Sequence, residues 1–134
     1  MNNLRFATIV HILVLSEKFK DELITSDFIA GSINVNPVVV RREIQVLKNA
    51  KILDSKKGKD GGCFLNKDPK DITLGDIYNL ITKDLDFGKK NHPNPNCPVG
   101  KQMNMSLDLL FTSVEKNIIE QLDQITLKEF SAQF

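Results

Sequence analysis

The chain has 134 residues, of which 41% are hydrophobic and 26% are charged. This length fits one domain, or one domain with a dimerising extension, and excludes two independent cores. No apolar run approaches the roughly 18 residues that a membrane span needs, and the first residues lack the cleavage site of a signal peptide. Two cysteines without an export signal indicate a reducing compartment, so we expect a cytoplasmic protein with reduced thiols.

Basic residues are concentrated in the first half of the chain. Residues 1–67 carry a formal charge of +4, and residues 68–134 carry −3. The densest stretch, 41–59, holds seven Lys or Arg against two acidic residues. This asymmetry indicates one surface for a polyanion, although an ordinary solvated surface would give the same pattern.

Three helices are predicted in the first 50 residues. Apolar residues at spacings of three and four indicate the first helix over 4–19. A cluster of capping residues at 25–27 begins the second helix, which extends to about residue 33. Asn36 as cap and Pro37 as first residue begin the third helix, which ends near residue 49. Its core-facing residues are Val40, Ile44 and Leu47.

A β-hairpin is predicted directly after the third helix. Residues 52–57 and 63–65 can form its two strands, and the glycine-rich segment 58–62 suits the turn. Two short helices joined by about three residues form a helix-turn-helix, and a hairpin that follows at once is a wing. The sequence therefore predicts a mainly α protein with a small β-hairpin, in which 1–82 is a winged helix-turn-helix domain.

The second half of the chain is predicted to hold a linker and a long helix. Residues 73–76 resemble a capping box with Asp in place of Glu, and they begin a helix that extends to about residue 81. Residues 83–96 are polar and contain glycine and proline, so we expect a flexible linker. A helix of about 25 residues follows Cys97 and Pro98, and Thr126 caps a short last helix within 97–134.

The long helix carries an apolar stripe at spacings of three and four residues. The stripe consists of Met103, Leu107, Leu110, Val114, Ile118 and Leu122. Because the linker separates this helix from the first core, we expect the stripe to be the interface of a homodimer. Packing within one chain would give the same pattern.

The helix-turn-helix and the wing supply candidate contacts to double-stranded DNA. Side chains on the first turns of a recognition helix read base edges in the major groove, whereas Lys, Arg and helix N-termini contact phosphates. The candidates are Thr25, Ser26, Asn36, Val38, Arg41, Arg42, Gln45, Lys56, Lys57 and Lys59. The alternative for Arg41 and Arg42 is pairing with Asp27 or Glu43 within the chain. A dimer that binds DNA should prefer an inverted repeat as its operator.

Several of these stretches resemble one protein family. They are Val-Arg-Arg-Glu-Ile at 40–44, Leu-Lys-Asn-Ala-Lys-Ile-Leu at 47–53, the wing at 57–65 and Cys-Pro-Val-Gly at 97–100. With them the chain resembles the Rrf2 family of bacterial regulators, in its YwnA-like branch, over nearly its whole length. The resemblance implies dimeric winged-helix transcription factors, mostly repressors, whose long helices cross in the dimer.

Three features depart from the family pattern. Some members bind an iron–sulfur cluster through three closely spaced cysteines in the linker, and this chain has only Cys97 there. One thiolate cannot hold a cluster that needs about four ligands, so we expect no cluster and no other cofactor or metal. Lys51 stands where the family usually has glycine, and Cys63 stands where the wing usually has an aromatic residue.

Cys97 is the candidate for chemistry, together with Cys63 as a possible disulfide partner. Pro98 favours a first helical turn, so Cys97 is predicted to be an N-cap, where the helix dipole stabilises a thiolate. We hypothesise that oxidants or electrophiles modify Cys97 and alter the dimer and its DNA affinity. The alternative is a small residue packed under the dimer helix, and a packing residue of the wing in the case of Cys63.

No catalytic class fits the sequence. An enzyme needs a nucleophile with a base, or a metal cluster, and the chain has two histidines. Asp84, Asp86, His92 and Cys97 match no closed zinc pattern. The remaining alternative to a DNA-binding regulator is a winged helix that binds protein, and the polar outer face of the third helix argues for DNA.

Overall fold

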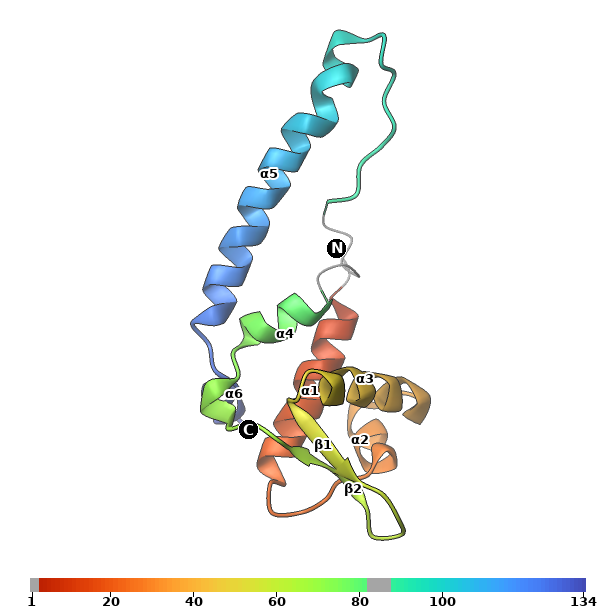
Figure 1. Ribbon diagram of the computed structural model, residues 1–134, viewed down its shortest axis with the longest axis vertical. Helices are drawn as coiled ribbons and strands as arrows, with labels where there is room; N and C mark the ends of the chain where they lie inside the picture. Colours follow the sequence, from red (N-terminus) through yellow and green to blue (C-terminus); the bar gives the residue numbers. More distant parts are fainter. Residues whose placement is uncertain (1–2, 82–87) are drawn as a thin grey trace.

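The computed structural model describes residues 3–81 and 88–134. The described residues form six α-helices, one 3-10 helix and one two-stranded antiparallel sheet. This confirms the predicted fold class, a mainly helical winged helix-turn-helix with a long C-terminal helix (Figure 1). In chain order the elements are α1 (Leu4–Lys18), α2 (Ser26–Ile33), α3 (Pro37–Asn49), β1 (Leu53–Lys56), β2 (Gly62–Leu65), η1 (Pro69–Asp71), α4 (Leu74–Ile81), α5 (Pro98–Asp123) and α6 (Leu127–Ser131).

The core is built around α1. This helix contacts α2, α3, α4, α6 and β2, so apolar side chains occupy most of its circumference rather than one stripe. Ile9, Ile12 and Leu13 are fully buried, and they meet Ile29 of α2 and Val40 of α3 in one hydrophobic cluster. Because α1 is packed on several sides, it provides a fixed support for α2 and α3, the two helices of the helix-turn-helix.

The helix-turn-helix is fixed by the predicted caps. The side chain of Thr25 accepts a hydrogen bond from the Phe28 N–H at 3.1 Å, and that of Asn36 accepts one from the Val38 N–H at 2.9 Å. Pro37 occupies the first turn of α3, where its missing donor costs nothing. Asn34 ends α2 in the left-handed conformation, with φ of 65°, which turns the chain sharply into α3.

The end of α3 holds Lys51 in a conformation that is typical of glycine. Lys51 has φ of 65°, a left-handed conformation that glycine, and to a lesser extent Asn, adopts readily and lysine does not. The Lys51 N–H donates to the Lys48 carbonyl and the Ile52 N–H donates to the Leu47 carbonyl, both at 3.0 Å. These two bonds form a Schellman motif, whose left-handed position is usually glycine. Lysine occupies that position here.

The wing is a hairpin with a third strand-like partner. Leu53 pairs with Leu65 and Lys56 with Gly62, and Gly58, with φ of 111°, lets the chain reverse. Ile24, just before α2, forms an isolated bridge with Cys63. Gly62 lies so close to Ile24 that a Cβ would be 2.7 Å from its carbonyl oxygen. The wing is therefore packed directly against the entry to the helix-turn-helix.

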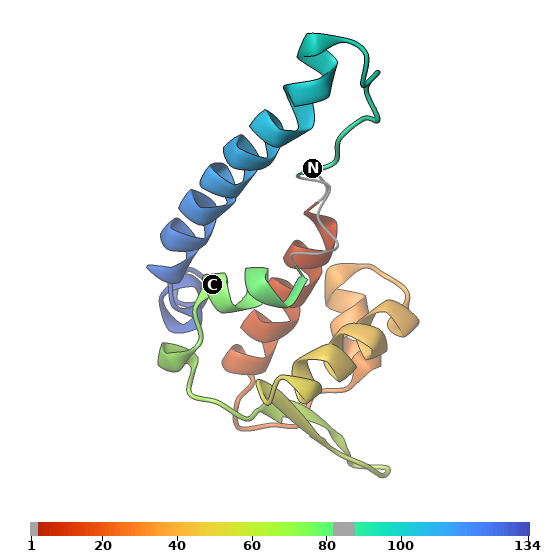
Figure 2. The same ribbon diagram turned by 45° about the horizontal axis from the view of Figure 1, so that its top comes forward.

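The last helix returns to the same core. The predicted capping box forms, since the Thr73 N–H donates to Asp76 Oδ2 and the Asp76 N–H donates to Thr73 Oγ1, both at 3.0 Å. Thr73 also forms a bridge with Thr126, and Leu127 of α6 is fully buried in the cluster around α1. The expected segment 97–134 grouped the long helix and the last helix together. In the structure α6 packs on the core, whereas α5 extends away from it (Figure 2).

The long helix α5 stands apart from the rest of the molecule. None of its 26 residues, all of which the structure describes, is buried. Its C-terminal part contacts α4, while its N-terminal part lies far from the winged domain (Figure 1). Of the expected linker 83–96, residues 83–87 lie outside the described residues. The described remainder has no helix or strand, and the Asn104 side chain of α5 donates to its Asn91 carbonyl at 3.0 Å.

Candidate DNA-binding surface

The outer face of α3 is polar and accessible. Val38, Arg41, Arg42 and Gln45 are exposed, with Val38 62% exposed although it is apolar. The opposite face holds the buried residues Val40, Glu43 and Leu47. The helix therefore presents to solvent the side chains that the sequence assigned to base reading, and an apolar side chain in such a position suits a thymine methyl group.

Both arginines of this face make ion pairs within the chain. Arg41 Nη2 lies 3.6 Å from Asp27 Oδ1 on α2, with both side chains more than half exposed. Arg42 Nε lies 3.7 Å from Glu43 Oε1. Pairs between exposed groups contribute between about 0 and 1 kcal/mol. The alternative expected from the sequence thus holds for both residues. The exposed Arg41–Asp27 pair is weak enough for a phosphate or a base to replace, whereas the carboxylate that pairs with Arg42 is only 1% exposed.

Two polar contacts extend this face beyond the residues predicted from sequence. Gln45 Nε2 donates to Asn49 Oδ1 at 3.1 Å, which places Asn49 on the same face one turn later. Lys48 Nζ donates to Ser55 Oγ of β1 at 2.7 Å. The i, i+4 spacing of Gln45 and Asn49 is a signal that sequence reasoning could have used.

A groove joins the recognition helix to the wing. It has a volume of about 190 Å³, and its polar lining includes Ser26, Arg41, Gln45, Lys48 and Lys56. Lys57 and Lys59 are exposed in the turn that follows β1. Thr25, Asn36, Val38 and Arg42 do not line this groove. The structure thus gathers four of the ten predicted contacts in one groove and leaves the others on the helix termini, the outer face of α3 and the wing turn.

Glu43 is a buried charge whose burial the apolar periodicity of α3 did not predict. Ile44, which the periodicity placed on the core-facing side, is half-buried and packs against the core. Glu43 beside it is 1% exposed. Arg5 Nε of α1 donates to both Glu43 carboxylate oxygens, at 3.0 and 2.9 Å. The sequence signal is weak, since the partner lies 38 positions away.

The two cysteines lie in different environments. Cys97 is exposed and caps α5, and its Sγ accepts a long hydrogen bond of 3.5 Å from the Gly100 N–H. Cys63 is buried in β2. Burial raises the pKa of the Cys63 thiol, and a hydrogen bond with Ser16 opposes this only in part. The start of α5 and the hairpin lie at opposite ends of the molecule (Figure 1), so the fold holds Cys63 away from Cys97.

The predicted stripe of α5 changes character along its length. Met103 and Leu110 are exposed, and Leu107, Val114 and Ile118 are half-buried. Leu122 packs on the core of its own chain. Val99, Met105 and Leu109 are also exposed, so the N-terminal half of α5 is the part that displays apolar surface.

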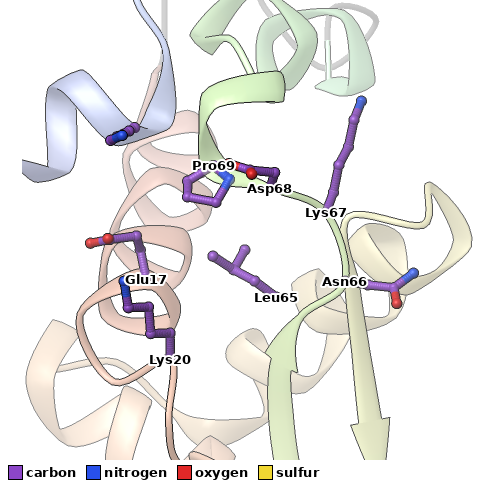
Figure 3. A pocket seen from close by; sticks show the side chains of 8 residues that line it. Glu17, Lys20, Leu65, Asn66, Lys67, Asp68 and Pro69 are labelled. Carbon is purple, nitrogen blue, oxygen red and sulfur yellow. The ribbon is translucent and has the colours of Figure 1, made fainter.

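A separate pocket lies beside α1 and the segment that follows β2 (Figure 3). Its volume is about 530 Å³, and its lining includes Glu17, Lys20, Lys67, Asp68 and Lys128. Because carboxylates and ammonium groups both face it, the pocket has no single-sign potential and does not extend the basic DNA-binding surface.

The donor side chains do not fit an iron–sulfur cluster held by one chain. The part of the chain that the structure describes contains no group of three or more His, Cys, Asp or Glu side chains placed to hold a metal ion. Asp84 and Asp86 lie outside the described residues. Cys63 is committed to the core of the wing, which leaves one thiolate where about four ligands are needed.

Among the described residues, no helix is long and apolar enough to cross a membrane.

Comparison with known proteins agrees with this geometry. The chain is 44% identical over 130 residues to the "Putative HTH-type transcriptional regulator YwnA" of Bacillus subtilis (strain 168), covering 96% of each chain. A solved structure described as a "putative DNA binding protein" is 42% identical, with a TM-score of 0.73, over 94% of this chain and 97% of the other. A "putative transcriptional regulator" from Lactobacillus plantarum is 25% identical, with a TM-score of 0.79, over 98% and 89%.

The family model agrees with these relatives. Residues 3–133 match the model of Rrf2, described as "Iron-dependent Transcriptional regulator". This family consists of regulators rather than enzymes, as the sequence predicts. The chain is therefore a DNA-binding transcriptional regulator of the helix-turn-helix type that belongs to the Rrf2 family.

Proposed function

We propose that this protein is a homodimeric, sequence-specific repressor that binds inverted-repeat operators in the cytoplasm. The observation that carries the proposal is the outer face of α3, where Arg41, Arg42 and Gln45 are exposed beside a basic wing. A winged helix that binds protein would present an apolar face there. A repressor acts by occupying its operator, which a rigid recognition helix on a packed core achieves without a catalytic step.

Each contact has a role that its chemistry supports. Arg41, which lines the groove beside the wing, reads guanine, Gln45 reads adenine, and Val38 contacts a thymine methyl group. Arg42, outside that groove, neutralises a phosphate. The N-terminus of α2, with Thr25 and Ser26, and the cap Asn36 position the protein on phosphates. Lys56, Lys57 and Lys59 of the wing reach the backbone or the minor groove.

The exposed half of α5 supports the homodimer. Val99, Met103 and Leu110, which share one face of the helix, are all at least 41% exposed, and a monomeric protein rarely leaves such large apolar side chains together in water. We propose that Met103, Leu107, Leu110, Val114 and Ile118 form the interface with a second copy. Leu122, at the end of the stripe, serves the core of its own chain.

Cys97 supports a thiol-based response without an iron–sulfur cluster. Its thiol is exposed at the N-cap of the proposed dimer helix, where modification adds bulk or charge at the start of the interface. The raised pKa of Cys63 keeps that buried thiol protonated. We therefore propose Cys97 as the sensor, and we assign Cys63 to packing of the wing.

Selection from a library of random duplexes with the reduced protein tests the proposed function. An inverted repeat, with half-sites about one helical turn or a multiple apart, is expected among the bound sequences. Affinity for the selected duplex should fall steeply with salt, with log K decreasing by about 0.9 per phosphate contact for each unit of log salt. A library without enrichment, together with binding that salt does not affect, would favour the protein-binding alternative.

Matched variants test the dimer interface and the role of the Cys97 thiol separately. Leu110→Asp should produce monomers in sedimentation equilibrium, whereas Thr112→Asp, a substitution on the opposite face of α5, should not. Cys97→Ser should abolish the effect of an oxidant on DNA binding, and Cys63→Ser should leave that effect in place. An oxidant response that survives Cys97→Ser would remove Cys97 from its proposed role.

A further inference from the structure

Glu43 is an unusual residue for a recognition helix. Its carboxylate is 1% exposed and lies on the inner side of α3, one residue after the proposed DNA contact Arg42. A buried carboxylate is costly unless cations or donors neutralise it. The cations that neutralise Glu43 therefore influence the charge that α3 presents to DNA.

Two arginines share this carboxylate unequally. Arg5 Nε lies 3.0 and 2.9 Å from its two oxygens, and the Arg5 side chain is 29% exposed. Arg42 Nε lies 3.7 Å from Oε1, beyond hydrogen-bond distance, and its side chain is 69% exposed. Arg5 thus makes the close contact, and Arg42 remains largely in solvent.

The structure gives Arg42 room to turn inward. A cleft of about 390 Å³ lies beside the ion pair, and its lining includes Arg5, Val39, Arg42 and Glu43. Without the Arg5 guanidinium, the buried carboxylate would keep its need for a cation. Arg42 is already in ion-pair range, and a small rotation of its side chain would bring it to hydrogen-bond distance. That rotation would point its guanidinium toward α1 and away from the outer face.

We propose that Arg5 is a positioning residue for DNA binding, because it neutralises Glu43 and so leaves Arg42 free to bind DNA. The inference rests on the proposed function, in which Arg42 contacts DNA. It assigns a role in recognition to a residue on the first turn of α1, outside the helix-turn-helix and the wing. Arg5 acts through Glu43 and contacts no DNA itself.

The test compares salt slopes in a set of variants. Binding to one fixed duplex is measured by fluorescence anisotropy over a salt series for the wild type, Arg5→Met, Glu43→Gln and the double variant, each with and without Arg42→Met. Arg5→Met should make the slope of log K against log salt shallower by about 0.9 per protomer, the loss of one phosphate contact. If the variant and the wild type bind equally at 1 M salt, this difference in slope makes the variant about fivefold weaker per half-site at 0.15 M salt.

Rescue and epistasis distinguish positioning from a merely structural role. Glu43→Gln removes the charge that would capture Arg42, so it should restore the slope in the Arg5→Met background. Arg42→Met should make the slope shallower in the wild type and have no further effect after Arg5→Met. Equal effects of Arg42→Met in both backgrounds, or no rescue by Glu43→Gln, would overturn the inference. A slope that Arg42→Met leaves unchanged in the wild type would instead contradict the proposed DNA contact.

Two further variants keep the test decisive if Arg5→Met does not fold. Arg5→Lys retains a cation beside Glu43 and should keep the wild-type slope, even if thermal unfolding shows a lower stability. Glu43→Gln alone should keep or steepen the slope, because the Glu43 carboxylate no longer competes with DNA for the Arg42 guanidinium. A folded Glu43→Gln variant with a shallower slope would show that the ion pair serves only the fold.

Discussion

Lys51→Gly should stabilise this protein, although it removes a charge and an entire side chain. Lys51 has φ of 65° at the end of α3, and an L-residue in this conformation costs roughly 1–2 kcal/mol. Glycine removes that cost, but it also makes the unfolded chain more flexible, which lowers the free energy of unfolding by about 0.4–1 kcal/mol. The net gain should be about 0.5–1 kcal/mol, which raises the Tm of a chain of this length by about 2–4 °C.

The contacts of the Lys51 backbone survive the substitution. Its N–H still donates to the Lys48 carbonyl, and its carbonyl still accepts from Asn66 Nδ2. Lys67→Gly is the matched control, because Lys67 is exposed and is not among the described residues with positive φ, so this variant should be neutral or destabilised. Thermal unfolding is compared at one protein concentration. A lower Tm for Lys51→Gly than for Lys67→Gly would refute the reasoning from backbone strain.

Three more predictions follow from particular contacts. Gly62→Ala should lower the free energy of unfolding by about 1–3 kcal/mol, because its Cβ would meet the Ile24 backbone, whereas Gly31→Ala in α2, with open space around it, should be neutral or stabilising in urea unfolding. Asp76→Ala should cost about 1 kcal/mol through the lost bond to the Thr73 N–H, and Asp76→Glu should retain most of the stability. Burial raises the pKa of Cys63 above its ordinary 9.0 and that of Tyr78 above 10.0, so the folded state keeps protons that the unfolded chain releases. The contribution of these two groups to stability should therefore be constant below about pH 9 and fall above it; Cys63→Ala should make the fall shallower, and an unchanged pH dependence of the urea midpoint would contradict this.

Local signals in the sequence were sufficient for most of the fold. The caps Thr25, Asn36, Cys97 and Thr126 are all observed, because an N-cap depends on residues within three positions of it. The capping box at Thr73 formed with Asp76 for the same reason. The left-handed conformation of Lys51 also has a local setting, since two backbone hydrogen bonds at the end of α3 accompany it.

Features that depend on distant residues were not predictable in this way. The burial of Glu43 requires Arg5, and the closeness of Gly62 to Ile24 requires the wing to fold against the start of α2. The return of α6 to the core depends on the bridge between Thr73 and Thr126. The apolar stripe of α5 predicted a helix correctly, but periodicity cannot divide its members between the chain's own core, where Leu122 packs, and an exposed face.

The central claim is that the outer face of α3 reads base sequence, and DNA selection with the wild type and Gln45→Ala in parallel tests it most directly. The wild type should enrich an inverted repeat. Gln45→Ala should enrich the same repeat with the same spacing, but lose the preference at one symmetry-related position in each half-site, since a good bidentate contact provides about 1–3 kcal/mol of discrimination. Identical motifs from the two proteins would contradict the assignment of Gln45, and the absence of any motif from the wild type would contradict the account as a whole.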